Sequence, residues 1–353
     1  HERRACAIDG RRLGAIFVAN SGAFNLDHVR TLTGQRHRTI GTGDKTRQFQ
    51  NFQTFERLHL ATSNQSNIVY TRQLLARGLG LHKNPDRKEK RVNVSQDITT
   101  EVDPLGIMTV TLNRPDKKNA MRLSMWRRLG EIFREASASS EIRGVILTGA
   151  GGNFCTGADI SEFDDVRATP QQGMDYDRIN DETVLAIRDC GKPVCAAIRG
   201  YCVGGGMSLA LACDFRIAAS DARMGITAGR LGLVYSLMDC QLLMEQVGLR
   251  SAKRILLGAD IFDLGVAQAL GLVDTLAQAD VVACSLEFLN AMAKSAPLSQ
   301  AGNKAILNAI ADGSVARRRD ELEGLISASF GSADYVEGRK AFVERRPAQF
   351  HGN

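Results

Sequence analysis

The sequence predicts an α/β domain of about 260 residues, preceded by a basic segment of 91 residues. Three observations support this. Short apolar runs rich in β-branched residues recur between residues 106 and 219, and Gly-rich loops follow two of them. Between the runs, apolar residues repeat at helical spacing, and from Ser236 onward the helical period dominates. Repeated strand–loop–helix units indicate a sheet covered by helices, large enough to bury a sizeable core.

The basic segment differs from the rest of the chain in charge and in pattern. Residues 1–91 hold 17 of the 45 lysines and arginines but 7 of the 39 acidic residues, and they show little sustained apolar period. We interpret them as an N-terminal extension that is disordered or not native to the protein. An organelle-targeting presequence and an arm that binds nucleic acid or a membrane surface are the alternatives. We expect nucleic-acid binding only through this segment.

The first elements of the domain follow Val92 in a regular order. Gly106–Leu112 alternates and is β-branched, which is typical of a strand, and Asn113–Asp116 has the composition of a turn. Apolar residues at helical spacing over residues 126–136 predict a helix with one buried face. Three further runs predict buried strands, at Gly144–Thr148, Pro193–Ile198 and Phe215–Ala219.

The last third of the chain is predicted to be mostly helical. Expected helix stops are Gly248, Gly258, Gly271 and Pro297. We divide the domain into a core over residues 92–290 and a C-terminal helical region over 291–353. No run reaches the ~18–20 apolar residues that a membrane span requires. The eight cysteines contain no C-x-x-C pair and often lie in apolar runs, so we expect reduced core cysteines and a cytoplasmic protein.

Two glycine-rich loops are the most informative segments, and common motifs do not fit them. Gly152 and Gly157 have the spacing of a phosphate-binding P-loop, but Ala158 and Asp159 stand where Lys and Ser or Thr are needed. A dinucleotide fingerprint would need glycine in place of Phe154. Residues 92–353 contain a single histidine, at position 351, which argues against a Ser-His-Asp triad and a His-ligated metal.

Backbone donors are what such loops offer chemically. Glycines let main-chain N–H groups face outward, and the second loop, Gly200–Gly206, opens into a predicted helix whose N-terminus favours negative charge. Two N–H groups that converge from separate loops form an oxyanion hole, which suits a carbonyl oxygen that gains charge. The alternative is that these glycines only form tight turns with close packing.

Five motifs together resemble the crotonase (enoyl-CoA hydratase/isomerase) superfamily over about residues 94–350. They are Asn113-Arg114-Pro115, Lys118-Asn119-Ala120, Gly157-Ala158-Asp159-Ile160, Gly204-Gly205-Gly206 and the ending Glu337–Pro347. The resemblance implies a crotonase-like ββα spiral with a C-terminal helical trimerisation region, and hence homotrimers or hexamers. It also implies an acyl-CoA thioester as substrate, with coenzyme A entering only as part of that substrate and no metal.

The resemblance also assigns binding residues. It implies that the backbone N–H groups of Ala158 and Gly205 form the oxyanion hole. Substrate-binding positions, several of them against the CoA moiety, are implied at Lys118, Ala120, Asp159, Ile160, Phe342 and Arg345. Many members have a lysine three residues after the oxyanion alanine, and Ser161 stands there in this chain.

The usual acid and base are replaced in this chain. The family's two catalytic glutamates align with Ser208 and Ala228. Because water addition needs a base for the water and an acid for the α-carbon, we expect hydration to be slow. Tyr235, Ser236 and Asp239 are the local candidates for acid/base groups. Alternatively, Asp239 complements a helix dipole and Tyr235 is a packing residue.

We therefore expect an acyl-CoA-processing enzyme that stabilises a thioester enolate. Alternatives within the superfamily are isomerisation, decarboxylation and thioester hydrolysis. An alternative from another class is a relative without turnover that binds CoA esters or RNA.

Overall fold

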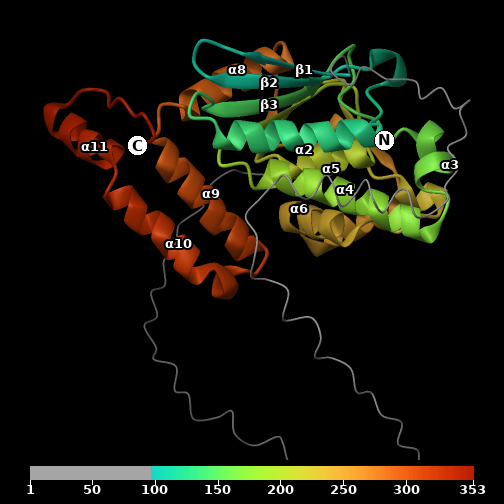
Figure 1. The fold of residues 1–353 in the computed structure, drawn as a ribbon. Helices are drawn as coiled ribbons and strands as arrows, with labels where there is room; N and C mark the ends of the chain where they lie inside the picture. The colour runs from blue at the N-terminus through green and yellow to red at the C-terminus, as the bar shows by residue number, and fades with distance from the viewer. Residues whose placement is uncertain (1–96) are drawn as a thin grey trace, which may run out of the picture. The chain divides into compact units, whose positions relative to one another are not determined.

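A six-stranded sheet lies at the centre of the computed structural model, which describes residues 97–353 (Figure 1). Its strands, in spatial order, are β1 (Ile98–Val102), β2 (Ile107–Leu112), β3 (Gly144–Gly149), β4 (Val194–Ile198), β6 (Phe215–Ala218) and β9 (Thr275–Leu276). β1 and β2 are antiparallel, and all other neighbours are parallel. The interpretation of residues 1–91 lies outside the described residues and stays a prediction.

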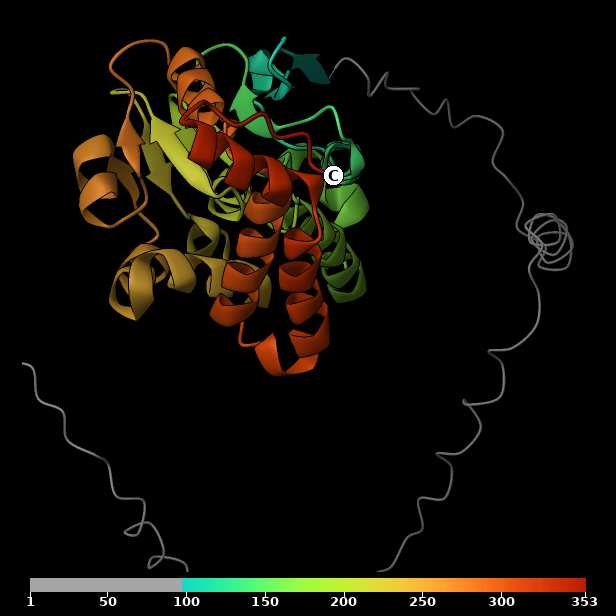
Figure 2. The same ribbon diagram turned by 90° about the vertical axis from the view of Figure 1, so that its left-hand side faces the viewer.

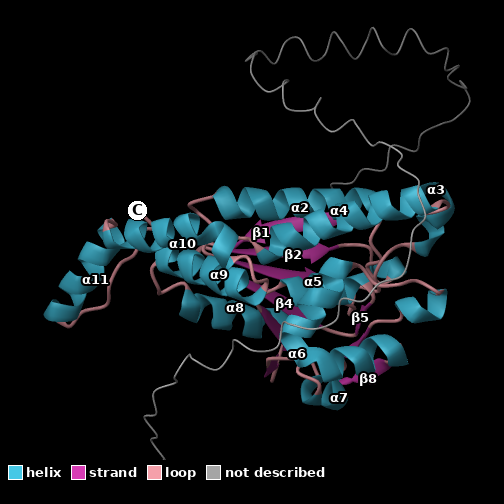
Figure 3. Ribbon diagram, turned by 90° about the horizontal axis from the view of Figure 1, so that it is seen from below, coloured by secondary structure: helices cyan, strands magenta, loops and turns pink. Residues whose placement is uncertain are grey.

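Helices cover both faces of this sheet (Figures 1 and 3). One face packs against α2 (Leu123–Ala138), α4 (Pro170–Arg188) and α5 (Gly205–Ala212), and the other against α8 (Val281–Met292). Val145 and Leu147 of β3 belong to the first core, whereas Ile146 between them belongs to the second. Strands buried on both faces appear as continuous apolar runs, and this is why β3 and β4 are recognisable in the sequence.

The predicted buried face of α2 is confirmed. Trp126, Leu129 and Phe133 are fully buried, and the helix packs along α4 (Figure 3). α4 begins at Pro170 behind a capping box made by Thr169 and Gln172. This pair of helices covers the sheet beside both glycine-rich loops.

A second, smaller sheet was not predicted. It contains β5 (Tyr201–Val203), β7 (Arg223–Gly225) and β8 (Ile261–Asp263), with β5 parallel to β7 and β8 antiparallel to it. Strands of three residues are too short to show a period. Short helical turns connect the larger elements, at η2 (Pro115–Lys117), η3 (Ile160–Glu162), α3 (Phe163–Val166) and η4 (Ala228–Leu231).

The C-terminal third is mostly helical, as predicted, although β8 and β9 interrupt it. Its helices are α6 (Leu237–Gly258), α7 (Leu264–Ala269), α8, α9 (Pro297–Ala311), α10 (Val315–Phe330) and α11 (Ala333–Glu344). Gly248 breaks the helical geometry inside α6 with φ 71°, and Gly258 ends that helix. Pro297 does not stop a helix but begins α9, where its missing N–H costs nothing.

The helical region after α8 extends beyond the sheet. α9 and α10 pack against each other, and α11 follows near the C-terminus (Figure 2). All seven cysteines among the described residues are free, and five of them are buried. Within residues 97–353, no helix combines the length and the apolar character needed to cross a membrane.

Candidate functional site

The candidate site is a cavity of about 130 Å³ at the point where the two glycine-rich loops meet. The first loop borders it with Thr156, Gly157, Ala158 and Ile160, and the first turn of α5 borders it on another side. The remaining wall comes from η4, from the segment that leads into α6 and from residues of α4. The cavity thus lies at an edge shared by elements that are far apart in the sequence.

The two loops touch through their glycines. Gly157 has φ +93°, and a Cβ atom placed there would lie 3.0 Å from the main-chain nitrogen of Gly205. The N–H of Met121 donates to the Gly157 carbonyl (2.7 Å) and that of Asp159 to the Met121 carbonyl (2.8 Å). Ala158 lies between these bonds. Within residues 97–353, no acceptor pairs with the N–H of Ala158 or of Gly205.

Close packing explains the glycines on the α5 side. A Cβ atom at Gly205 would lie 3.0 Å from the Trp126 ring, and one at Gly206 would lie 2.3 Å from the Cys155 carbonyl oxygen. The Trp126 ring is held in turn by a hydrogen bond from its Nε1 to the Tyr176 hydroxyl (2.9 Å). Close packing therefore accounts for these glycines, and it holds Gly157 and Gly205 against each other at the wall of the cavity. The oxyanion hole stays a prediction.

A buried ion pair fixes the first loop. The Arg114 guanidinium contacts the Asp159 carboxylate at 2.8 Å and also donates to the Ala120 carbonyl. Burial works to raise the pKa of Asp159, but hydrogen bonds from Ser161 and Arg114 outweigh it, and the pKa is lowered. Asp159 thus stays ionised, and its contact with Arg114 supports the loop that carries Ala158. Its predicted substrate-binding role stays a prediction.

Asn119 links this loop to the glycine-rich turn after β3. Its side chain accepts a hydrogen bond from the Arg114 N–H (2.9 Å) and donates to the carbonyls of Ala150 (2.9 Å) and Asn153 (2.6 Å). Asn119 is fully buried and has φ +57°. The neighbouring Lys118 is exposed, and its ammonium lies 4.7 Å from the centre of the Tyr201 ring.

The predicted binding residues do not all lie at the cavity. Ala158, Ile160 and Gly205 border it, whereas Lys118 and Ala120 lie on the adjoining loop. Phe342 is 85% exposed on α11, and Arg345 caps the end of that helix. Neither borders the cavity within this chain.

No glutamate borders the cavity among the described residues. Ser208 and Ala228, the two positions aligned with the family's glutamates, both lie in its wall. The carboxyl groups that border it are those of Asp177 and Asp239. Any acid/base chemistry by a carboxyl group would therefore start from one of these two.

Asp239 combines burial with an unpaired oxygen. The residue is 2% exposed, and its Oδ1 atom has no hydrogen-bond partner within the described residues. Burial raises the pKa of Asp239 to about 7, with a further rise from the charges of Asp181 and Asp177 and opposing hydrogen bonds from Ser208 and Ser236. A carboxyl group with such a pKa accepts and returns protons readily near neutral pH.

Residues of α4 complete this environment and were missed by the sequence reasoning. Asp181 accepts a hydrogen bond from the Ser236 hydroxyl (3.0 Å). Asp177 pairs with Arg167 at 2.8 Å, and the guanidinium of Arg167 lies over the rings of Phe163 and Tyr176. A single polar stripe on an amphipathic helix carries no signal that distinguishes these residues from a solvated face.

Tyr235 does not present a free hydroxyl to the cavity. Its oxygen lies 2.6 Å from the Ser208 hydroxyl, and it donates to the Gly204 carbonyl at 2.8 Å. Burial, followed by the charge of Asp239, raises the pKa of Tyr235 well above 10. The phenol therefore stays protonated at neutral pH and does not act as a base there.

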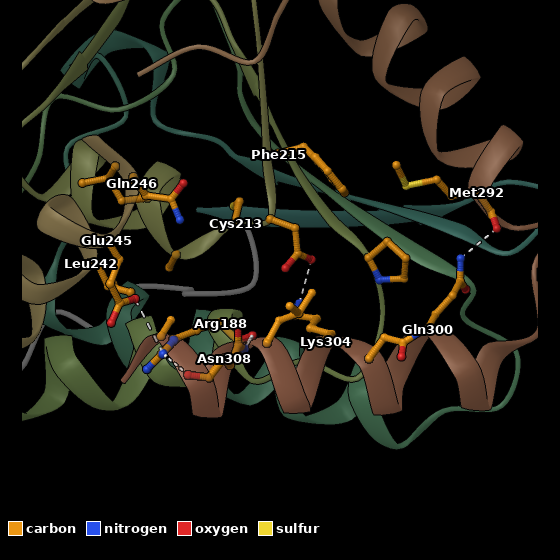
Figure 4. Close-up of a pocket in the computed structure, with 17 residues that line it drawn as sticks. Arg188, Cys213, Phe215, Leu242, Glu245, Gln246, Met292, Gln300, Lys304 and Asn308 are labelled. Carbon is orange, nitrogen blue, oxygen red and sulfur yellow. Dashed lines mark hydrogen bonds and ion pairs between the residues drawn. The ribbon is translucent and has the colours of Figure 1, made fainter. Parts of the chain in front are cut away.

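A larger cavity, of about 530 Å³, lies between α6, α9 and the end of α5 (Figure 4). Its charged groups are paired with one another. Lys304 contacts Asp214 at 2.7 Å, and Arg188 lies 3.3 Å from Asp312 and 3.7 Å from Glu245. Asp214 also accepts a hydrogen bond from the Val194 N–H. This cavity offers no free acid/base group comparable to Asp239.

Comparison with known proteins places the chain among related sequences and folds. Residues 103–353 match the sequence profile described as enoyl-CoA hydratase/isomerase. A relative in Mycobacterium leprae, named "Probable enoyl-CoA hydratase", is 32% identical over 251 residues, which cover 70% of this chain and 96% of the relative. The 1,2-epoxyphenylacetyl-CoA isomerase of Escherichia coli is 31% identical over 257 residues, which cover 70% and 95%.

Solved structures give the same result for the fold. An enoyl-CoA hydratase/carnithine racemase from Magnetospirillum magneticum matches with a TM-score of 0.68 and 35% identity. The match covers 73% of this chain and 96% of that one. A putative enoyl-CoA hydratase/isomerase family protein from Hyphomonas neptunium matches with a TM-score of 0.69 and 32% identity, over 73% and 99% of the two chains. The predicted crotonase-like fold is thereby confirmed.

Proposed function

This chain belongs to the enoyl-CoA hydratase/isomerase family, and from that premise we propose that it shifts a double bond within an acyl-CoA thioester, with Asp239 as the only acid/base group. The observation that carries the proposal is the buried carboxyl of Asp239, whose Oδ1 atom has no partner among the described residues, in the wall of the cavity that Ala158 and Gly205 also border. The names of the relatives include both hydratases and an isomerase, so the choice between reactions rests on the site.

The thioester carbonyl is proposed to bind at the N–H groups of Ala158 and Gly205. Both are free to donate, and the packing around Gly157 and Trp126 fixes the loops that carry them. Donors that are fixed before the reaction stabilise developing negative charge without a cost of reorganisation. The CoA moiety is expected along the Lys118–Ala120 loop.

Proton transfer then needs one carboxylate. The ionised Asp239 removes a proton from the α-carbon of a 3-enoyl thioester, so that a C–H bond breaks, an O–H bond forms and the charge moves to the thioester oxygen. The same carboxyl returns the proton to the γ-carbon, and the double bond ends between the α- and β-carbons. Atoms and charge balance without water or another reactant.

Water addition is disfavoured by the same arrangement. It needs a second group that activates water while the first protonates the α-carbon. Ser208 and Ala228 supply no carboxylate, and Asp177 is engaged with Arg167. A serine hydroxyl that donates to Tyr235 cannot serve as that base.

The test is a pair of assays on the full chain. A 3-enoyl-CoA should be converted to its 2-enoyl isomer, seen as the appearance of conjugated thioester absorbance, and crotonyl-CoA should lose that absorbance only slowly. Asp239→Asn should lower the isomerisation rate about 10²–10⁴-fold. Rapid hydration together with absent isomerisation would show that the proposed reaction is wrong.

A further inference from the structure

The peptide unit between Gly204 and Gly205 carries both the candidate oxyanion donor and an unusually well-occupied carbonyl. Its N–H, from Gly205, has no acceptor among the described residues, and Gly205 borders the cavity. Its carbonyl, from Gly204, accepts hydrogen bonds from the N–H groups of Met207 (2.8 Å) and Ser208 (3.2 Å) and from the Tyr235 hydroxyl (2.8 Å). Hydrogen bonds to a carbonyl polarise the amide and strengthen the bond that its N–H donates.

The direction of the neighbouring hydrogen bond follows from donor counting. A phenol has one hydrogen, and a carbonyl can only accept, so the hydrogen of Tyr235 is used on Gly204. Ser208 must therefore be the donor in its 2.6 Å contact with the Tyr235 oxygen. The Ser208 oxygen is then left with lone pairs alone. Asp239 borders the same cavity as Ser208, and its carboxyl can donate to that oxygen only when it is protonated.

Ionisation of Asp239 reverses the direction of the hydrogen bond between Asp239 and Ser208. A carboxylate has no hydrogen and attracts the hydroxyl of Ser208, which can then no longer donate to Tyr235. The phenol of Tyr235 is thereby drawn toward the serine oxygen, and its bond to the Gly204 carbonyl weakens. The Ser208–Tyr235 pair thus has two arrangements, and the proton on Asp239 decides between them.

We propose that Tyr235 and Ser208 are positioning residues that couple the proton on Asp239 to the strength of the oxyanion donor at Gly205. This inference rests on the proposed function. When Asp239 has taken the substrate proton, the chain of donors runs from its carboxyl through Ser208 and Tyr235 to the Gly204 carbonyl. The Gly205 N–H then donates most strongly while the enolate exists. Proton transfer to the base and stabilisation of the enolate oxygen are thereby coupled.

The groups that face Asp239 limit what else could titrate. Asp177 and Asp181 face it from α4, and Arg167 pairs with Asp177. Tyr235 and Cys240 lie next to it, and burial raises the pKa of both, so they remain protonated at neutral pH. A transition near neutral pH that disappears in Asp239→Asn is therefore assigned to Asp239.

Isotope-edited infrared spectroscopy tests the coupling without turnover. The probe is butyryl-CoA with ¹³C at its thioester carbonyl, bound to the full chain, because its saturated acyl group cannot isomerise. In the wild type, the carbonyl stretch should fall on binding and fall further as the pH is lowered from 9 to 5. Asp239→Asn, whose amide can donate to Ser208 at every pH, should hold the stretch near the low-pH value.

Two variants that each remove one hydroxyl group test the contributions of Ser208 and Tyr235 separately. Ser208→Ala should abolish the pH dependence and keep most of the shift, because Tyr235 still donates to Gly204. Tyr235→Phe should lose the pH dependence, reduce the shift and lower kcat about tenfold with little change in KM, less than the ~10²–10³-fold that loss of a direct oxyanion donor costs. Tyr335→Phe on α11 makes the same deletion far from the cavity and should change nothing.

The outcomes separate this inference from the proposed function. A wild-type shift that is independent of pH, or that is unchanged in Tyr235→Phe, overturns the coupling and leaves the proposed reaction standing. A pH-dependent shift in a protein that does not isomerise 3-enoyl-CoA supports the coupling and rejects the reaction. The absence of any shift in bound butyryl-CoA overturns both.

Discussion

Replacing Asp239 by asparagine should lower the isomerisation rate about 10²–10⁴-fold and, at the same time, stabilise the fold in a pH-dependent way. The pKa of Asp239 is raised from 3.8 to about 7 in the folded state. Between these values the folded protein binds one proton more than the unfolded chain, so the contribution of this group to stability is complete below about pH 4 and is lost as the pH rises through 7. A difference of about three pKa units corresponds to about 4 kcal/mol.

Asparagine keeps the shape and never ionises, so the variant avoids this loss. Its free energy of unfolding should match the wild type near pH 4 and exceed it by about 4 kcal/mol at pH 8. For a domain of this size, that amounts to a rise in Tm of about 10 °C at pH 8. Melting curves of both proteins across this pH range measure the difference directly, and errors common to both proteins cancel.

Asp320→Asn on the exposed surface of α10 is the matched control, since it changes the same group outside the cavity. The Tm of Asp320→Asn should equal that of the wild type at every pH, and its isomerisation rate should be unchanged. A Tm difference between Asp239→Asn and wild type that does not vary with pH would refute the raised pKa. Retained isomerisation would refute the role of Asp239 even if the stability curves agree.

Three further predictions concern the rest of the site and the assembly. Gly205→Pro should lower turnover at least ~10²–10³-fold because proline removes the N–H, whereas Gly205→Ala meets the same Trp126 contact, keeps the N–H and should retain more activity in the same assay. Hydration of crotonyl-CoA should be at least about a hundredfold slower than in a relative with two catalytic glutamates, and an ordinary hydratase rate would contradict the alignment of Ser208 and Ala228. Because Phe342 and Val343 are more than 80% exposed, α11 should pack against another copy, and light scattering should report a trimer or hexamer; a stable monomer at micromolar concentration would oppose this.

The sequence predicted the strands and helices that are buried on a large scale. β3 and β4 were recognisable because both of their faces are covered, and α2 because one face is fully apolar. β5, β7 and β8 were missed because three residues carry no period. Pro297 was placed at the right boundary but on the wrong side of it, because proline both ends and begins helices.

The parts of the candidate site that lie in short sequence motifs were predictable. Glycines that follow buried strands indicated free backbone donors, and the family resemblance left Asp239 as one of three local acid/base candidates. Which candidate is buried, and which already has a partner, depends on contacts between α4, α5 and α6. Tyr235 therefore could not be distinguished from an acid/base group until its bond to Gly204 was seen. The pair Asp177 and Arg167 has no signature along the sequence at all.

The glycines around the cavity also set how this protein can change over generations. A side chain at Gly149 or Gly206 would lie within 2.4 Å of backbone atoms, and one at Gly157 would press on the peptide of Gly205. Any substitution at these glycines should therefore destabilise the fold through steric overlap. Positions 208, 228, 235 and 239 border the cavity, so a change there alters its lining and not the backbone of the loops. Substitutions that the fold tolerates are therefore expected among the side chains that would move protons, whereas the packing of the loops preserves the backbone groups that would bind the thioester oxygen.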